Sequence, residues 1–331
     1  MEKRTIGKSG IEVSAMAMGA WAIGGGITWG ENDDEESIRS IHCALDSGIT
    51  WIDTAPAYGL GHSEEVVGRA LKGRRDKVVV STKCGLQWYD GEGTLHMKRD
   101  GAVIMRNLSP KSIRRDLEKS LKRLDTDYID VYYTHWQSVE PFFIPVQETM
   151  AELMKMKQEG KIRAIGASNV TVDHMKEYLK YGQLDVIQEK FSMVDRKAEI
   201  ELLPFCEENG LTLQAYSPIE QGLLTGKVGL DYKIRPGEVR DNKKWWKPEN
   251  HKLVLEMFEG WGDLTKKYQA SIGNLVIAWT MARSKNLNVL CGARKIPQVQ
   301  ENVKAAEITL EKADFDRMTA DADAIIAKSV D

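Results

Sequence analysis

The sequence is poor in the residues that build metal centres and disulfide frameworks. Its four cysteines are widely separated, form no CxxC pair and have no histidine at ligand spacing: Cys43, Cys84, Cys206 and Cys291. The six histidines never occur as a close pair. Clustered ligands of this kind are needed for a zinc site or a metal-dependent hydrolase. We therefore expect no metal, and we expect each cysteine to be a reduced, buried side chain.

Neither sign of charge predominates, and no long apolar run is present. The 331 residues carry 46 Lys and Arg against 49 Asp and Glu, a net charge of -3. The chain thus lacks the basic surface typical of proteins that bind nucleic acids or anionic membranes. Its least polar long stretch, residues 15–27, is too short and too rich in glycine to cross a bilayer, and no secretory signal follows Met1. These absences predict a cytoplasmic protein that acts on a small molecule. The sequence is silent on subunit contacts, and a monomer or small homo-oligomer is expected.

Short apolar runs of strand length alternate with helix-length periodic segments along almost the whole chain, which favours parallel βα units. Strands are expected at residues 15–18, 50–53, 78–83, 129–134, 162–167, 186–188, 212–216 and 288–291. Amphipathic helices are expected at residues 33–46, 63–71, 109–124, 146–159, 172–180 and 271–283. Eight such units predict an α/β fold, a closed (β/α)8 or TIM barrel, formed by residues 1–331 as a single domain.

Three segments fall outside this alternation. Residues 4–13, with Gly7-Lys8-Ser9-Gly10 in the middle, predict a β-hairpin ahead of the first unit that closes the bottom of the barrel. Residues 86–110 and 220–250 are longer than ordinary connections. Because both follow expected strands, we expect them to lie on the C-terminal face of the barrel as functional lids.

Four titratable side chains follow or end three consecutive expected strands. Asp53 ends one strand and Tyr58 lies in the loop behind it, while Lys83 and His135 end the next two strands. The C-terminal ends of strands in a parallel barrel face one common pocket. The sequence therefore predicts that these four groups meet in a catalytic site.

This set could donate a proton to a carbonyl oxygen during its reduction. A phenol with a pKa of about 10 is a weak acid at neutral pH. We expect the Lys83 ammonium to lower the pKa of Tyr58 and Asp53 to keep the lysine charged, so that Tyr58 becomes a competent general acid. His135 would orient the substrate oxygen. Taken singly, each residue has a structural explanation, as a cap, a solvated strand end, a packing tyrosine or a structural histidine; their joint placement favours catalysis.

Several strings along the chain, in order, resemble the aldo-keto reductase family. They are Ile52–Ala55 with Tyr58-Gly59, Gly61–Glu65, Ser81–Lys83, Asp127–Asp130 with His135-Trp136, Gly166–Asn169, Ala215–Pro218 with Gly222–Leu224, and Gly292–Arg294 with Gln298 and Glu301-Asn302. The sequence looks closest to the bacterial branch that includes general stress and inositol-operon reductases. The resemblance implies a (β/α)8 barrel with an NAD(P)H cofactor lying across its C-terminal face.

The resemblance also implies the residues of the cofactor site. They are Gly19, Ala20, Trp21, Asp53, Ser168, Asn169, Gln188, Tyr216, Ser217, Pro218, Leu223, Lys227, Gly292, Arg294, Gln298, Glu301 and Asn302. By this match Ser168, Asn169 and Gln188 hold the nicotinamide amide and Tyr216 stacks on its ring. Ser217, Leu223 and Lys227 lie along the pyrophosphate, and the four residues from Arg294 to Asn302 surround the adenosine.

Aromatic residues suggest the substrate pocket, and two departures from the family pattern lie beside the cofactor. Trp21, Trp88 and Trp136 are expected in the pocket, and Trp245 and Trp246 occupy a long loop that could contribute to it. The family often continues from the glutamine on the sixth strand to a Tyr-Asn pair, whereas Gln188 is followed here by Glu189-Lys190-Phe191-Ser192. Cys291 stands where a proline is common.

The main hypothesis is an NADPH-dependent oxidoreductase that reduces aldehydes or ketones to alcohols, with Tyr58 donating the proton. Arg294 and Lys295 follow the last strand and could form only a solvated basic turn. The family resemblance, however, places this turn beside the adenosine ribose, where guanidinium geometry suits a 2'-phosphate, so NADPH is expected to be preferred over NADH. One alternative is a cofactor-binding regulatory subunit that turns over slowly, like the channel-associated β subunits of the family. Another is a barrel isomerase or lyase, which would need no nucleotide.

Overall fold

Eight parallel strands close into a barrel in the computed structural model, which describes residues 1–331. In order around the barrel they are β3 (Met16–Gly19), β4 (Trp51–Asp53), β5 (Val79–Cys84), β9 (Ile129–Thr134), β10 (Ile162–Ser168), β11 (Val186–Lys190), β12 (Thr212–Tyr216) and β13 (Leu287–Gly292). The last strand pairs with the first, Gly292 standing opposite Gly19. Every expected strand is present within two residues of its expected ends, so the (β/α)8 prediction is confirmed.

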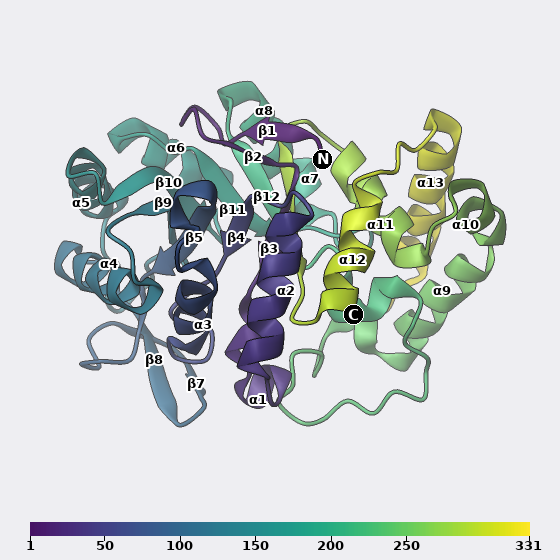
Figure 1. Cartoon of the computed structure of the whole chain (residues 1–331), viewed down its shortest axis with the longest axis horizontal. Helices are drawn as coiled ribbons and strands as arrows, with labels where there is room; N and C mark the ends of the chain where they lie inside the picture. The colour runs from purple at the N-terminus through teal and green to yellow at the C-terminus, as the bar shows by residue number, and fades with distance from the viewer.

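Helices cover the outside of the barrel (Figure 1). Those that the sequence predicts are α2 (Asp34–Asp46), α3 (His62–Leu71), α4 (Pro110–Leu124), α5 (Val146–Gln158), α6 (Val172–Tyr181) and α11 (Ile272–Ala282). Helix α4 begins at its proline, and Ile113, Leu117 and Leu121 are buried along one face. This stripe packs on the sheet, as the sequence pattern requires.

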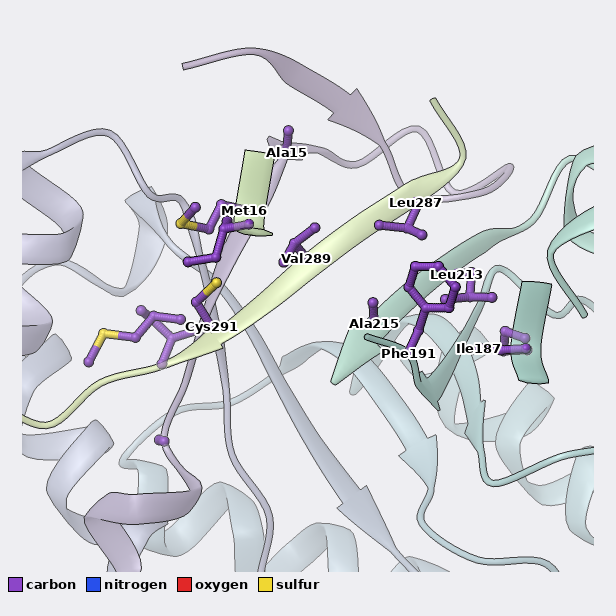
Figure 2. Close-up of a cluster of buried hydrophobic side chains, with 14 of the residues drawn as sticks. Ala15, Met16, Ile187, Phe191, Leu213, Ala215, Leu287, Val289 and Cys291 are labelled. Atoms are coloured by element: carbon purple, nitrogen blue, oxygen red, sulfur yellow. The ribbon is translucent and has the colours of Figure 1, made fainter. Parts of the chain in front are cut away.

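The strands bury both of their faces, as parallel strands under helices do. Leu287, Val289 and Cys291 of β13 belong to the layer between barrel and helices, together with Leu213 and Ala215 of β12 (Figure 2). All four cysteines are unpaired; three are buried, and Cys43 is half-buried rather than fully enclosed because it lies on helix α2 near the surface.

A hairpin formed by β1 (Lys3–Thr5) and β2 (Glu12–Ser14) precedes the barrel, as expected. Ile6 and Val13 are buried in the cluster that fills the barrel interior. The Arg4 guanidinium donates to the carbonyls of Met281 and Ser284 and to that of the first residue of β13. The hairpin thus closes the N-terminal end of the barrel.

The long segments lie at the opposite end (Figure 1). Residues 86–106 form a three-stranded antiparallel sheet of β6 (Leu86–Gln87), β8 (Ala102–Arg106) and β7 (Thr94–Arg99), where the sequence predicts only a loop. The mixed exposure of β7 and β8 explains why no alternating apolar pattern revealed them. Near them lie the short helices η1 (Trp21–Gly24) and α1 (Gly26–Trp29).

The other elements are short connections and C-terminal helices. They are η2 (Arg75–Lys77), α7 (Lys197–Ile200), α8 (Leu202–Asn209), η3 (Glu220–Thr225), η4 (Lys244–Trp246), α9 (Pro248–Glu259), α10 (Gly262–Tyr268), α12 (Ile296–Ala305) and α13 (Lys312–Lys328). None of the helices combines the length and the apolar composition that a membrane crossing requires.

Candidate active site

Lys83 joins Asp53 and Tyr58 at the C-terminal end of the barrel. Its Nζ lies 2.8 Å from Oδ2 of Asp53, donates to the Thr54 carbonyl at 2.8 Å, and donates to the Tyr58 hydroxyl at 3.2 Å. Lys83 and Asp53 are buried and Tyr58 is half-buried. A charged lysine in such a place needs its anionic partner, because an isolated buried charge is costly.

Burial and charge act in opposite directions on Tyr58. Burial raises the pKa of Tyr58 more than the Lys83 ammonium lowers it. Burial also acts to lower the pKa of Lys83, but Asp53 and the phenol more than offset this and the pKa lies above its ordinary value. The Lys83 ammonium lowers the pKa of Tyr58 as expected, but desolvation of the phenolate outweighs this effect, so the net shift is upward rather than downward. At neutral pH the phenol is protonated and the lysine charged.

His135 stands beside the phenol. The two ring centroids are 5.9 Å apart and the rings are nearly perpendicular. Burial, the Lys83 ammonium and His96 hold the pKa of His135 well below its usual range, so the imidazole is neutral. Its Nδ1 is buried without a hydrogen-bond partner. A neutral imidazole next to a protonated phenol offers two polar groups to one carbonyl oxygen.

Three buried amide side chains connect Asp53 to the closed end of the barrel. Gln188 donates from Nε2 to Oδ1 of Asp53 at 3.0 Å and to Oε1 of Gln214 at 2.6 Å. Gln214 donates to Oδ1 of Asn288 at 3.1 Å, and Asn288 donates to the Ser14 carbonyl at 2.9 Å. We call Gln188, Gln214 and Asn288 the interior amide chain. It fixes one oxygen of Asp53 while Lys83 takes the other.

The residues expected at the nicotinamide end lie together around His135. Ser168 donates to the Gln188 carbonyl at 2.7 Å, and Asn169 donates from Nδ2 to the His135 carbonyl at 2.9 Å. The Tyr216 hydroxyl donates to Oδ1 of Asn169 at 3.1 Å. These contacts link the ends of β10, β11 and β12 into one wall next to the phenol.

Residues 217–226 form a strained segment after β12, the seventh barrel strand. Ser217, Glu220, Gln221 and Gly222 have φ values of 57°, 44°, 53° and 102°. A side chain added at Gly222 would meet nothing nearer than 4.0 Å, and Oε1 of Gln221 is buried without a partner. Left-handed backbone exposes N–H groups that bind anions, and loops after the seventh and eighth strands often hold phosphate in TIM barrels. The segment therefore fits the diphosphate of a dinucleotide.

A buried ion pair supports this segment from below. The Glu220 carboxylate accepts from the Ser192 hydroxyl at 2.7 Å and lies 3.1 Å from Nζ of Lys190. The departure from the family pattern after Gln188 thus supplies a loop anchor. Leu223 is fully buried, so only its main chain can face the phosphates.

The residues expected around the adenosine also gather at one place. The Arg294 amide donates to Oε1 of Gln298 at 3.0 Å, and the Lys227 ammonium lies 3.0 Å from Oε1 of Glu301. Asn302 donates to the carbonyl of Gly292, at 3.4 Å. The Arg294 guanidinium donates to the carbonyls of Trp29 and Glu31, at 3.3 and 3.1 Å, and has no carboxylate partner.

The aromatic residues divide into pocket and core. The Trp21 ring lies 6.1 Å from that of Tyr58, and the backbone at Gly19 and Ala20 borders Asp53. Trp136 follows His135, whereas the Trp88 ring lies 4.8 Å from the Tyr89 ring, tilted by 39°. Trp245 and Trp246 are 4% exposed and lie in the hydrophobic core. Of the two roles open to them, pocket wall and packing anchor, both therefore have the packing role, because helix η4 turns both side chains inward.

Residues in the long segments were missed by sequence reasoning. Trp29 packs edge-on against Trp21 at 5.4 Å, and the guanidinium of Arg240 lies 5.1 Å from the ring of Tyr232. His96 and Arg106 contact Trp136 from the β7–β8 hairpin. No spacing along the sequence signals these contacts, because each depends on how a long loop folds over the barrel.

Comparison with known proteins gives consistent matches. The model of the Aldo/keto reductase family matches residues 15–322. The NADH-specific methylglyoxal reductase of Escherichia coli (strain K12) is 49% identical over 327 residues, which cover 98% of this chain and 99% of the relative. Aldo-keto reductase YhdN of Bacillus subtilis (strain 168) is 36% identical over 317 residues, with 95% and 91% covered.

Solved structures agree with the observed barrel. The glycerol dehydrogenase AKR11B4 from Gluconobacter oxydans superposes with a TM-score of 0.86 at 34% identity, with 99% of this chain and 96% of that chain covered. An aldo-keto reductase from Klebsiella pneumoniae in complex with NADPH superposes with a TM-score of 0.72 at 26% identity, with 97% and 95% covered.

Proposed function

The chain belongs to the aldo/keto reductase family and is an NAD(P)H-dependent carbonyl reductase, and on this basis we propose that Tyr58 is its proton donor. The observation that carries the proposal is the contact between the Lys83 ammonium and the Tyr58 hydroxyl, at 3.2 Å, with Asp53 behind the lysine. A protonated phenol is the state that a proton donor requires.

The reaction needs one hydride and one proton. NAD(P)H, when bound, would supply the hydride that the carbonyl carbon receives. Tyr58 gives its proton to the carbonyl oxygen as negative charge develops there, and Lys83 stabilises the phenolate that forms. Neutral His135 orients the oxygen by hydrogen bonding. A proton from solvent then restores the phenol, and the alcohol leaves.

We propose that Ser168, Asn169 and Gln188 hold the nicotinamide amide and that Tyr216 lies against its ring. Residues 217–226, with Pro218 following the left-handed Ser217, would hold the phosphates through main-chain N–H groups. The donor set and the open space at Gly222 support this assignment. Arg294, Gln298, Glu301 and Asn302 would surround the adenosine.

For the substrate we propose small aldehydes and ketones, with methylglyoxal as the first compound to measure. The name of the Escherichia coli relative supports this choice. The names of the relatives, which are reductases and dehydrogenases, favour catalysis over the regulatory-subunit alternative. Loss of NADPH or NADH absorbance with methylglyoxal tests the proposal: sustained turnover is expected, and one oxidised nucleotide per chain followed by arrest would contradict it.

Four finer expectations stay predictions. They are the preference for NADPH, the place in the bacterial branch with general stress and inositol-operon reductases, a single domain over residues 1–331, and a cytoplasmic monomer or small homo-oligomer. The relative named as NADH-specific makes the cofactor preference the one to measure first.

A further inference from the structure

The β7–β8 hairpin has no part in the proposed mechanism, yet it borders the site. At its tip, Asp100 accepts a hydrogen bond from the Ile27 amide of α1 at 2.9 Å. At its base, Arg106 stacks its guanidinium over the ring of Trp136, 4.8 Å from the ring centroid. Trp136 directly follows His135. The hairpin therefore extends from helix α1, which carries Trp29, to Trp136 beside the proposed catalytic imidazole.

Arg106 has no acidic partner. Its Nε donates to Nδ1 of His96 at 2.9 Å, and Nη1 makes a long contact of 3.5 Å with the Gln137 carbonyl. Its Nη2 makes no hydrogen bond within the chain and is not enclosed by protein. The only arginines without an ion pair are Arg39, Arg99, Arg106 and Arg294. Arg294 is the one already proposed to meet an anionic part of the nucleotide.

The surroundings of Arg106 leave its charge unbalanced. His96 accepts the hydrogen bond from Arg106 through Nδ1, so its imidazole is neutral; burial, Arg106 and Arg99 lower the pKa of His96 to about 4. Burial also lowers the pKa of the half-buried Arg106. A partly desolvated guanidinium is stabilised by an anion, and its planar fork matches the two oxygens of a carboxylate.

We propose that Arg106, held by His96 and Trp136, binds a carboxylate group of the substrate, so that the enzyme favours carbonyl compounds that carry a carboxylate. This inference rests on the proposed function and names its substrate class. The carbonyl lies at Tyr58 and His135, and the carboxylate extends past Trp136 to the free Nη2 of Arg106. Neutral aldehydes occupy the same pocket without this contact.

The test compares each oxo acid with its own methyl ester. The probes are 4-oxobutanoate and 4-formylbenzoate, measured with wild type, Arg106→Met and Arg106→Lys. We expect the acids to be preferred by wild type, and we expect Arg106→Met to lower kcat/KM for the acids about tenfold or more, mainly through KM, as for a lost charge-assisted hydrogen bond. The esters should change little, and Arg106→Lys should retain part of the preference.

Arg99→Met is the matched control, since it removes the same charge from the same hairpin. The proposal is overturned if acids and esters fall together in Arg106→Met, or if Arg99→Met removes the preference equally. Calorimetric binding of 4-(hydroxymethyl)benzoate and its methyl ester, with oxidised nucleotide present, gives a readout independent of turnover. Wild type that binds the acid more weakly than the ester refutes the subsite, whereas absent turnover of both esters refutes the proposed function instead.

Discussion

All three hydrogens of the Lys83 ammonium are committed, to Asp53, to the Thr54 carbonyl and to Tyr58. None is left for a substrate. Lys83 therefore acts on the reaction only through the phenol, while Tyr58 and His135 are the groups that meet the carbonyl oxygen. Single substitutions at these positions should consequently give different kinetic signatures.

Replacing the phenol by a phenyl ring should remove the proton donor and little else. We expect Tyr58→Phe to keep nucleotide affinity and to lose roughly two to four orders of magnitude in turnover. Steady-state reduction of methylglyoxal and nucleotide titration by fluorescence measure the two quantities. Tyr181→Phe, at the C-terminal end of helix α6 and outside the residues assigned to the site, is the control. Near-normal turnover of Tyr58→Phe would refute the proton-donor role.

Removing the Lys83 charge should shift a pH profile. Burial already raises the pKa of Tyr58, and the ammonium opposes that rise. In Lys83→Met the pKa of the phenol rises further, so alcohol oxidation, which needs the phenolate, should reach its plateau at higher pH, and carbonyl reduction should slow. The pH dependence of alcohol oxidation measures this. Lys77→Met, at the exposed start of the same βα unit, is the control and should leave the pH profile unchanged. A Lys83→Met profile equal to that of wild type would contradict the prediction.

The choice of nucleotide depends on Arg294. Its guanidinium has no carboxylate partner, whereas Lys295 lies 3.7 Å from Glu36. We expect Arg294→Ala to weaken NADPH binding by about 1.5–3 kcal/mol, the scale of a hydrogen bond to a charged group, and hardly to affect NADH. Dissociation constants for both nucleotides measure it, with the Arg294→Ala/Lys295→Ala variant alongside. Equal losses would mean that the turn only shapes the site, and a wild-type preference for NADH would refute the assignment.

At the scale of elements, the sequence pattern predicts best the helices and strands that bury a regular apolar stripe. Strands buried on both faces and helices such as α4 carry that stripe, so their ends fall close to the expected ones. The β7–β8 hairpin carries none, because it is held by contacts with α1 and with the segment after β9. Helix α13, which is not among the expected helices, also carries a regular apolar stripe, formed by Phe315, Met318, Ala322 and Ile325 at helical spacing.

The same reasoning explains which parts of the site could be predicted. Asp53, Lys83 and His135 follow from the strand ends alone, since a closed parallel barrel brings those ends together. Trp29 and Arg106 could not be predicted, because their positions depend on tertiary contacts of long loops. The direction in which the pKa of Tyr58 shifts also depends on burial, which the spacing of residues in the sequence does not reveal.

The conformation of residues 217–226, after β12, should depend on the ion pair between Lys190 and Glu220. Lys190→Met leaves the buried Glu220 carboxylate without its cation. Because Lys190 is itself partly exposed, we expect a loss of about 2 kcal/mol in the free energy of unfolding, below the 3–5 kcal/mol for a fully buried pair. Nucleotide affinity should fall as well. Denaturant unfolding and nucleotide titration measure these, and the exposed Lys197→Met is the control; unchanged affinity would mean that the anchor does not shape the phosphate site.

At the scale of the whole molecule, Arg4 ties the first element to the last βα unit. It joins the N-terminal hairpin to the carbonyls at the end of α11 and the start of β13. Removing it should lower the free energy of unfolding by about 1.5–3 kcal/mol without changing nucleotide affinity. Denaturation of Arg4→Met against Lys3→Met, an exposed neighbour on the same strand, measures this. A loss of the same size in both variants would contradict the special role of Arg4.

The interior amide chain has a consequence for the way in which Tyr58 recovers its proton. From Asp53 toward the closed end, one branch of hydrogen bonds passes through the amides of Gln188, Gln214 and Asn288. The other branch passes through the Ser81 hydroxyl and ends at the indole N–H of Trp51, which keeps its hydrogen. Carboxamide groups hold their hydrogens at neutral pH and do not relay protons as hydroxyls or imidazoles do. The hydrogen bonds inside the barrel therefore do not conduct protons from its closed end to Tyr58. The phenolate must regain its proton from the C-terminal mouth of the barrel, the same side on which nucleotide and substrate enter and leave.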